Sequence, residues 1–279
     1  MLRQRILTAL VLVPLVVGGV LGLGTQPLAL LLAAVILLAG WEWASLVDSA
    51  RTSARVAYLV LLGLVLFGTA LAWQAHGVPA AIRWTLAPAL LGWVIAGGWV
   101  VAYQRSAGHR PAAPGPWTLR IVGLLVLVPP WLALVTVHGS GPEGPWLVLF
   151  LLVLIWTADS GAYFAGRRFG RHKLASRVSP GKSLEGVAGA LLLGSLFTLA
   201  AGVGLGIAGR TLGLFLLLGV ATVLVSVLGD LFESLVKRYR DVKDSGGLLP
   251  GHGGVLDRID SLTAAAPFFA VGQFWILGA

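Results

Sequence analysis

The chain has no cysteine in its 279 residues, which excludes disulfides, thiolate metal sites and a cysteine nucleophile. Charge is scarce as well: Asp, Glu, Lys and Arg make up 11% of the residues, whereas a soluble domain carries roughly 25%. Because 57% of the residues are hydrophobic, no soluble core of this size could bury them all. The composition excludes an ordinary soluble domain and indicates a polytopic membrane protein.

Long apolar runs fill most of the chain, each near the roughly 20 residues that a helix needs to cross the hydrocarbon of a bilayer. We therefore expect an all-α, polytopic integral membrane protein with about nine transmembrane helices. They are predicted at about 5–23, 27–47, 56–74, 85–103, 119–137, 144–164, 185–208, 211–234 and 261–278.

The distribution of basic residues predicts the orientation of these helices. With the N-terminus in the cytoplasm, 18 of the 20 Lys and Arg residues fall in cytoplasmic segments, and only Arg83 and Arg210 lie outside. The net charge of +9 then reflects topology and attraction to anionic lipids, so no nucleic-acid partner is expected. We expect a multi-pass protein of the inner cell membrane, with its functional site facing the cytoplasm.

The two parts of the chain differ in polarity. Residues 1–140 read as transmembrane helices that serve as a scaffold and could supply dimer contacts, with Trp side chains such as Trp43 near span ends, as in an interfacial belt. Residues 141–279 contain nine of the 11 acidic residues and two cytoplasmic loops, at roughly 165–184 and 235–260. Any chemistry is expected in this second part.

The segment from Ser234 to Asp260 packs five Lys or Arg, four Asp, one His and five Gly into 27 residues. Asp230 and Glu233 lie three residues apart just before it, and Asp257 and Asp260 have the same spacing, so each pair shares a helix face. An all-oxygen set of Asp230, Asp257 and Asp260 would suit Mg²⁺. Two other interpretations are an ion pair of Glu233 with Lys237 and a solvated, capped loop.

Two further polar features precede this segment. Asp159 stands at membrane depth among small residues, either in a site or in an interhelical hydrogen bond. The stretch 167–183 carries six basic residues, which suit either a phosphate-rich ligand or plain attraction to the lipid surface. Acids, basic residues and a Gly-rich loop on one membrane face favour metal-assisted transfer between phosphates.

The same residues form a recognisable signature. Ser234–Arg238, Lys243-Asp244, Leu249–Gly254 and Asp257–Asp260 together resemble the signature of the phosphatidate cytidylyltransferases, the CDP-diacylglycerol synthases. Upstream, Asp159–Tyr163, Gly166, Phe169-Gly170, Ser179–Gly186 and Gly229–Ser234 resemble that family too. The resemblance covers roughly residues 145–279. One departure is Gly181, where the family often has a second basic residue beside Lys182.

The resemblance implies transfer of CMP from CTP to phosphatidate, which gives CDP-diacylglycerol and pyrophosphate. It implies Mg²⁺ on Asp230, Asp257 and Asp260, K⁺ as a second cation, and a homodimer. The implied catalytic residues are Asp230, Lys237, Asp244, His252, Asp257 and Arg258. The implied substrate-binding residues are Asp159, Ser160, Lys182, Ser183, Ser234, Arg238, Lys243, Gly253 and Gly254.

The sequence leaves two other functions open. One is a CTP-dependent transferase or kinase that acts on another lipid phosphate or alcohol. The other is a cation-coupled transporter that uses the intramembrane acids Asp159, Asp230 and Glu233. The charges gather on one face instead of crossing the midplane, and no inverted repeat is visible, so the transporter is the weaker hypothesis.

Overall fold

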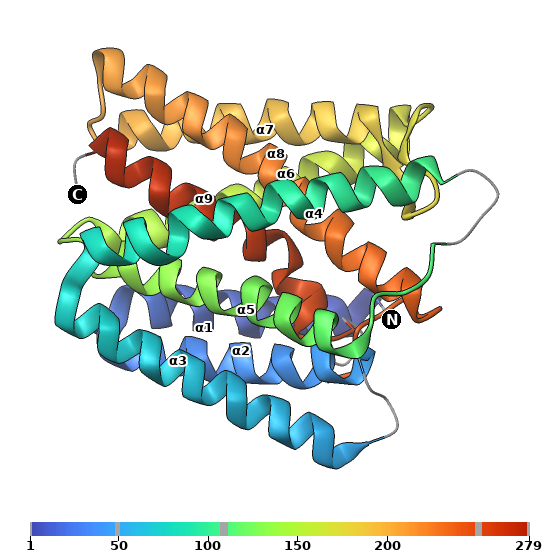
Figure 1. The fold of residues 1–279 in the computed structure, drawn as a ribbon. Helices are drawn as coiled ribbons and strands as arrows, with labels where there is room; N and C mark the ends of the chain where they lie inside the picture. Colours follow the sequence, from blue (N-terminus) through green and yellow to red (C-terminus); the bar gives the residue numbers. More distant parts are fainter. Residues whose placement is uncertain (1, 48–50, 107–110, 249–252, 278–279) are drawn as a thin grey trace.

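A computed structural model describes residues 2–47, 51–106, 111–248 and 253–277. The described residues form nine α-helices, one short π-helical segment and two strands (Figure 1). In chain order they are α1 (Leu2–Gly22), α2 (Thr25–Val47), α3 (Thr52–Ala81), η1 (Ile82–Leu86), α4 (Ala87–Arg105), α5 (Pro116–His138), α6 (Gly144–Phe169), β1 (Lys173–Ala175), β2 (Ser179–Ser183), α7 (Leu184–Gly204), α8 (Gly209–Tyr239) and α9 (Leu256–Leu277). Each predicted span falls on one of these helices.

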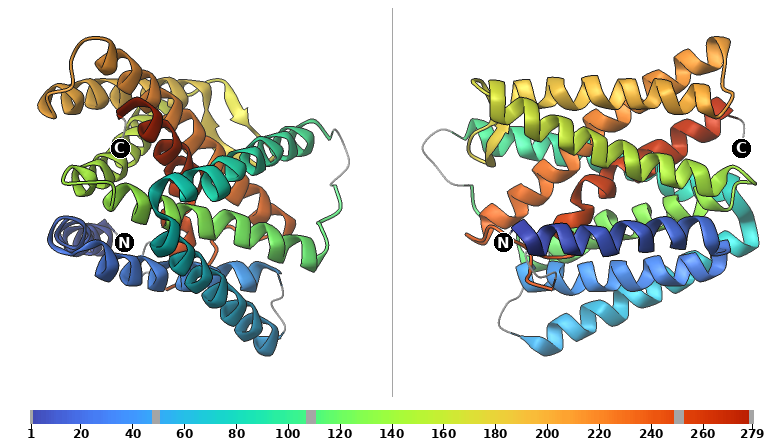
Figure 2. Two further views of the ribbon diagram at one scale, coloured as in Figure 1. Left: turned by 60° about the vertical axis from the view of Figure 1, so that its left-hand side comes forward. Right: turned by 180° about the vertical axis from the view of Figure 1, so that it is seen from behind.

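The helices pack side by side as a bundle, with α5 and α9 in its middle (Figures 1 and 2). Helix α9 contacts α8 and α5 most extensively, because small residues line it where those helices approach. Ala264, Ala265, Ala266 and Ala270 are all fully buried. Small side chains let helices approach closely, which is the usual packing device where lipid supplies no hydrophobic drive.

Helices α3 and α4 form one continuous 54-residue apolar run that folds back on itself. A straight helix of that length would extend about 80 Å, more than twice the thickness of bilayer hydrocarbon. Gly77 has a φ of 71°, and Pro79 follows it inside α3. Both interrupt the regular helix, and the chain reverses direction between α3 and α4 (Figure 1). The run therefore accounts for two of the predicted spans.

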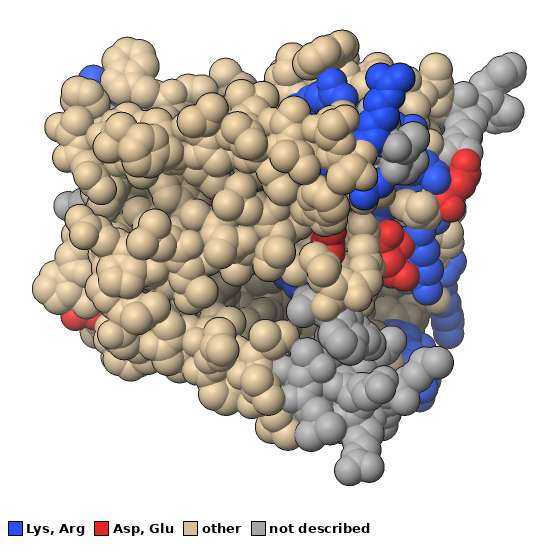
Figure 3. Space-filling model, turned by 90° about the horizontal axis from the view of Figure 1, so that it is seen from below, with Lys and Arg blue, Asp and Glu red and all other residues tan. Residues whose placement is uncertain are grey.

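Six helical runs of the described chain are long and apolar enough to cross a membrane, as a polytopic membrane protein requires. Large apolar side chains cover their outer faces; Leu30 and Val94, for example, are 74% and 71% exposed. In the view of Figure 3, Lys and Arg gather at one end of the molecule. The number of nine spans and the cytoplasmic orientation stay predictions.

The prediction of an all-α chain needs one correction. The basic loop before α7 forms an antiparallel hairpin, in which Lys173 pairs with Ser183 and Ala175 with Ser179. The hairpin is held against its neighbours. The Arg177 amide donates to Gln104 Oε1 at 3.0 Å, and Arg238 Nε donates to the carbonyl oxygen of Val178 at 3.1 Å. A segment that looks like a plain surface loop is thus a folded element docked between α4 and α8.

Candidate active site

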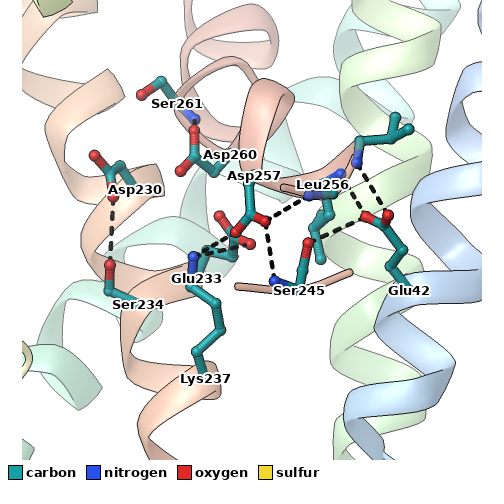
Figure 4. Close-up of polar contacts among 12 residues, drawn as sticks. Glu42, Asp230, Glu233, Ser234, Lys237, Ser245, Leu256, Asp257, Asp260 and Ser261 are labelled. Carbon is teal, nitrogen blue, oxygen red and sulfur yellow. Dashed lines mark hydrogen bonds and ion pairs between the residues drawn. The ribbon is translucent and has the colours of Figure 1, made fainter. Parts of the chain in front are cut away.

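Three segments that lie far apart in the sequence meet at the basic end of the bundle. They are the last turns of α8, the first turn of α9 and strand β2. Figure 4 shows the carboxylates of α8 and α9 facing one another, with Lys237 between Glu233 and Asp257. Close contact of α8 with α9 depends on Gly229, where a Cβ would lie 2.6 Å from the carbonyl oxygen of Asp260.

Strand β2 delivers Lys182 to the acids of α8. Lys182 Nζ lies 2.5 Å from Asp230 Oδ2, and the two side chains are 24% and 30% exposed. Ser234 Oγ donates to Asp230 Oδ1 over 3.4 Å, one turn further along α8. Gly181 has no side chain, so Lys182 is the basic residue that this turn presents to Asp230.

Asp257 is held on both of its carboxylate oxygens. Oδ1 accepts from Lys237 Nζ at 2.7 Å, and Oδ2 accepts from the amides of Gly254 at 2.8 Å and Ser245 at 3.0 Å. The bond to Gly254 reaches back three residues, as the acid of a capping box does at a helix start. Gly253 has a φ of 80°, and a Cβ there would lie 2.9 Å from Asp257 Oδ2, so glycine is required.

Glu233 is the most deeply buried acid of α8, with 3% of its surface exposed. Lys237 Nζ lies 3.4 Å from its Oε1, but neither oxygen accepts a hydrogen bond within the described residues. The charges that act on it most strongly are those of Asp260 and Lys237. The ion pair of Glu233 with Lys237 therefore exists, but Lys237 sits closer to Asp257.

Asp159 comes from α6 and joins the same group of charges. It is exposed on the surface of the chain, and the charges that act on it are those of Asp230, Lys182 and Arg258. This placement argues against a simple interhelical hydrogen bond for Asp159. Its neighbour Ser160 instead donates to the carbonyl oxygen of Trp156 at 2.8 Å, along its own helix.

Some of the other predicted site residues are exposed at the site, and others stabilise the elements around it. Ser183 is buried and caps α7, because its Oγ accepts from the Gly186 amide at 3.1 Å. Lys243, Asp244 and Arg258 are exposed at the same end, and Gly254 is buried. The prediction for His252 lies outside the described residues.

Glu42 of α2 also lies in the site region, although the sequence did not predict it as a site residue. It is 2% exposed and accepts three hydrogen bonds from Ser245, Val255 and Leu256. The signal that could have found it is an acid inside an apolar span between two tryptophans. The interfacial role predicted for Trp43 is wrong, because Trp43 is fully buried and donates to the carbonyl oxygen of Leu119 at 2.9 Å.

The candidate metal ligands are of the chemical type that Mg²⁺ binds. Every candidate ligand is a carboxylate, the type of hard oxygen that Mg²⁺ prefers. Five acids and three bases gather here, which leaves an excess of negative charge that a divalent cation would offset: Asp159, Asp230, Glu233, Asp257, Asp260, Lys182, Lys237 and Arg258. Asp230 is paired with Lys182, and Asp257 is paired with Lys237. The described residues contain no preformed group of three metal-ligating side chains. The set Asp230, Asp257 and Asp260 stays a prediction.

Comparison with known proteins gives a consistent result over the whole chain. A phosphatidate cytidylyltransferase from Pseudomonas aeruginosa is 44% identical over 278 residues, which cover 100% of this chain and 98% of that protein. One from Haemophilus influenzae is 40% identical over 99% of this chain and 100% of its own length. A third, from Thermotoga maritima, is 32% identical over 95% of this chain and 94% of its own length.

These matches include the N-terminal helices as well as the signature segment, so they extend the resemblance beyond residues 145–279. The model of the Cytidylyltransferase family matches residues 3–275. On this full-length match, together with close relatives that span the same length, the chain belongs to the cytidylyltransferase family.

Proposed function

We propose that this protein is a nucleotidyltransferase that transfers CMP from CTP to phosphatidate, giving CDP-diacylglycerol and pyrophosphate. Full-length relatives named phosphatidate cytidylyltransferase support the reaction. The observation that carries the assignment to a site is the meeting of β2, α8 and α9. There Lys182 and Lys237 stand among the carboxylates of Asp230, Glu233 and Asp257.

The chemistry is a substitution at phosphorus. A phosphate oxygen of phosphatidate attacks the α-phosphorus of CTP, and the bond from that phosphorus to the bridging oxygen of pyrophosphate breaks. The lipid phosphate is already an anion, so the protein needs no strong base to generate the nucleophile. Its task is to hold two polyanions in line and to stabilise the charge that develops on the leaving pyrophosphate.

The basic side chains of the site perform this task. Lys182, 24% exposed, can turn from Asp230 to a phosphate oxygen. Arg258 is exposed, its charge acts on Asp159 as that of Lys182 does, and it can bind a second phosphate group. Lys237 is buried against Asp257 and keeps that carboxylate in place. Mg²⁺ held by Asp230, Asp257 and Asp260 would neutralise triphosphate oxygens, and K⁺ is the proposed second cation.

The position of the site suits its two substrates. CTP is soluble, whereas phosphatidate lies in a membrane leaflet. Because the acids and lysines lie at the basic end of the helices, we place the site at the cytoplasmic face of the inner membrane. There it can accept CTP from water and the lipid from the side. The functional unit is proposed to be a homodimer.

Labelled CTP tests this function directly. The purified protein in phosphatidate-containing liposomes should convert CTP labelled at the α-phosphorus into a labelled lipid. CTP labelled at the γ-phosphorus should give labelled pyrophosphate and an unlabelled lipid. EDTA should abolish both, and Mg²⁺ should restore them. A lipid labelled only from the γ-position would identify a lipid kinase instead and would refute the proposal.

A further inference from the structure

Glu42 of α2 lies outside the family signature, which covers residues 145–279. It nevertheless contacts Ser245 and the first turn of α9, next to Asp257. Its Oε1 accepts from the Val255 amide at 3.0 Å. Its Oε2 accepts from the Leu256 amide at 2.8 Å and from Ser245 Oγ at 3.1 Å. Figure 4 shows Glu42 reaching from α2 to the start of α9.

The surroundings of Glu42 are built for a carboxylate. A buried negative charge is costly unless donors replace its water, and three donors do so here. Two of them are amides at the N-terminus of α9, where the helix dipole also favours a negative charge. A Cβ at Gly246 or Gly254 would collide with the Glu42 carboxylate, so both glycines are needed for the chain to pass around it.

Ser245 joins Glu42 to the site. Its hydroxyl donates to Glu42, while its amide donates to Asp257 Oδ2 at 3.0 Å. Gly254, which packs on Glu42, donates its amide to the same oxygen at 2.8 Å. Arg240, which follows α8, also donates to the carbonyl oxygens of Leu46 and Val47 at the end of α2. Both amides that donate to Asp257 are thus tied to Glu42: Ser245 binds Glu42 directly, and Gly254 precedes Val255, whose amide donates to Glu42.

We propose that Glu42 is a positioning residue for the reaction: it fixes Ser245 and the first turn of α9, so that the Asp257 carboxylate stays directed at Lys237. The inference rests on the proposed function and extends it to the N-terminal part of the chain. Glu42 does not touch substrate; it acts through Asp257. Loss of its charge should therefore lower turnover without altering the basic groups that bind phosphate.

Glu42→Gln tests this with the least change of shape. An amide has one acceptor oxygen, so at least one amide of the α9 turn would face an NH₂ group and lose its hydrogen bond. We expect kcat to fall by about 10- to 100-fold, as for other residues that orient a catalytic carboxylate from behind. The matched control is Trp43→Phe, on the same helix as Glu42. It removes the hydrogen bond from Trp43 to the carbonyl oxygen of Leu119 on α5. It should lower the melting temperature but keep kcat within about twofold of the unmodified protein.

Hydrogen exchange supplies a readout that does not depend on activity. In Glu42→Gln, peptides that contain Ser245 and residues 253–258 should exchange at least about fivefold faster, while peptides from α5 should not change. Uniformly faster exchange across α2 and α5, with kcat falling equally in both variants, would mean that Glu42 serves stability alone and would overturn the proposal.

Ser245→Ala provides a milder variant if Glu42→Gln fails to accumulate. It deletes one donor to Glu42 and keeps the amide that binds Asp257, so we expect kcat to fall about threefold to tenfold. An unchanged kcat in either variant would refute the role of Glu42. An unmodified protein that makes no CDP-lipid would instead refute the proposed function, so the two failures are distinguishable.

Discussion

The site contains two ion pairs of similar length that lie in different environments. Lys182 and Asp230, 2.5 Å apart, are 24% and 30% exposed. Lys237 and Asp257, 2.7 Å apart, are 9% and 8% exposed. A partly exposed pair exchanges its partner for a ligand at small cost, whereas a buried pair is costly to break. The comparison assigns phosphate binding to the first pair and fixed geometry to the second.

Asp257→Asn should produce the largest effect, because it breaks the buried pair. The amide would leave Lys237 with a weaker partner and would face one of the backbone amides that now donate to Oδ2. We expect turnover to fall by at least about 1000-fold while the protein still inserts and purifies normally. CDP-lipid formation measures turnover, and gel filtration of the same sample measures whether the protein is intact. Activity within tenfold of the unmodified protein would contradict the role of Asp257.

Lys182→Met should break the exposed pair with a different outcome. Loss of a phosphate-binding charge is expected to lower kcat/KM for CTP by about 100-fold. Because the pair is solvated, the free energy of unfolding should change by no more than about 1 kcal/mol.

The matched variant is Lys237→Met, which removes the lysine of the buried pair. It should destabilise the protein by about 3 kcal/mol, because it leaves Asp257 and Glu233 without a cation. Thermal unfolding and CTP titration of both variants check the contrast. Equal destabilisation by the two substitutions would remove the distinction between the pairs.

Gly229→Ala tests the helix contact that both pairs require. Its Cβ would lie 2.6 Å from the carbonyl oxygen of Asp260 and 3.1 Å from Ala264 Cβ, so α8 and α9 would have to separate. We expect a loss of about 1–3 kcal/mol in stability and about tenfold in kcat. Gly92→Ala is the matched control, since a Cβ there meets no atom within 4 Å. Normal activity in Gly229→Ala would show that the helix spacing is not critical.

Gly181→Arg should have the smallest effect and the opposite sign. The position is open, so a side chain fits without a clash. An added guanidinium beside Lys182 should lower KM for CTP by about twofold to fivefold, and the gain should shrink as salt is raised. Initial rates over a range of CTP and salt concentrations measure it. An increase in KM would mean that the hairpin turn does not face the nucleotide.

Much of the fold could be predicted because membrane helices have a strong local signal. Length and hydropathy placed each predicted span on a helix, including the reversal between α3 and α4. The hairpin at β1 and β2 was missed because its strands are too short and polar to stand out from a basic loop. Spacing also predicted that Asp230 and Glu233 share a face, since helical periodicity is local.

The sequence by itself determined the class of protein, the family signature and the side chains available for phosphate chemistry, because these depend on composition and short spacings. Only the tertiary structure decided how the charges pair. Nothing in local spacing could join Lys182 to Asp230 across a hairpin, or Glu42 to amides more than 200 residues away. The physical reason is that burial and partner choice depend on packing between helices, which brings distant segments within hydrogen-bond reach.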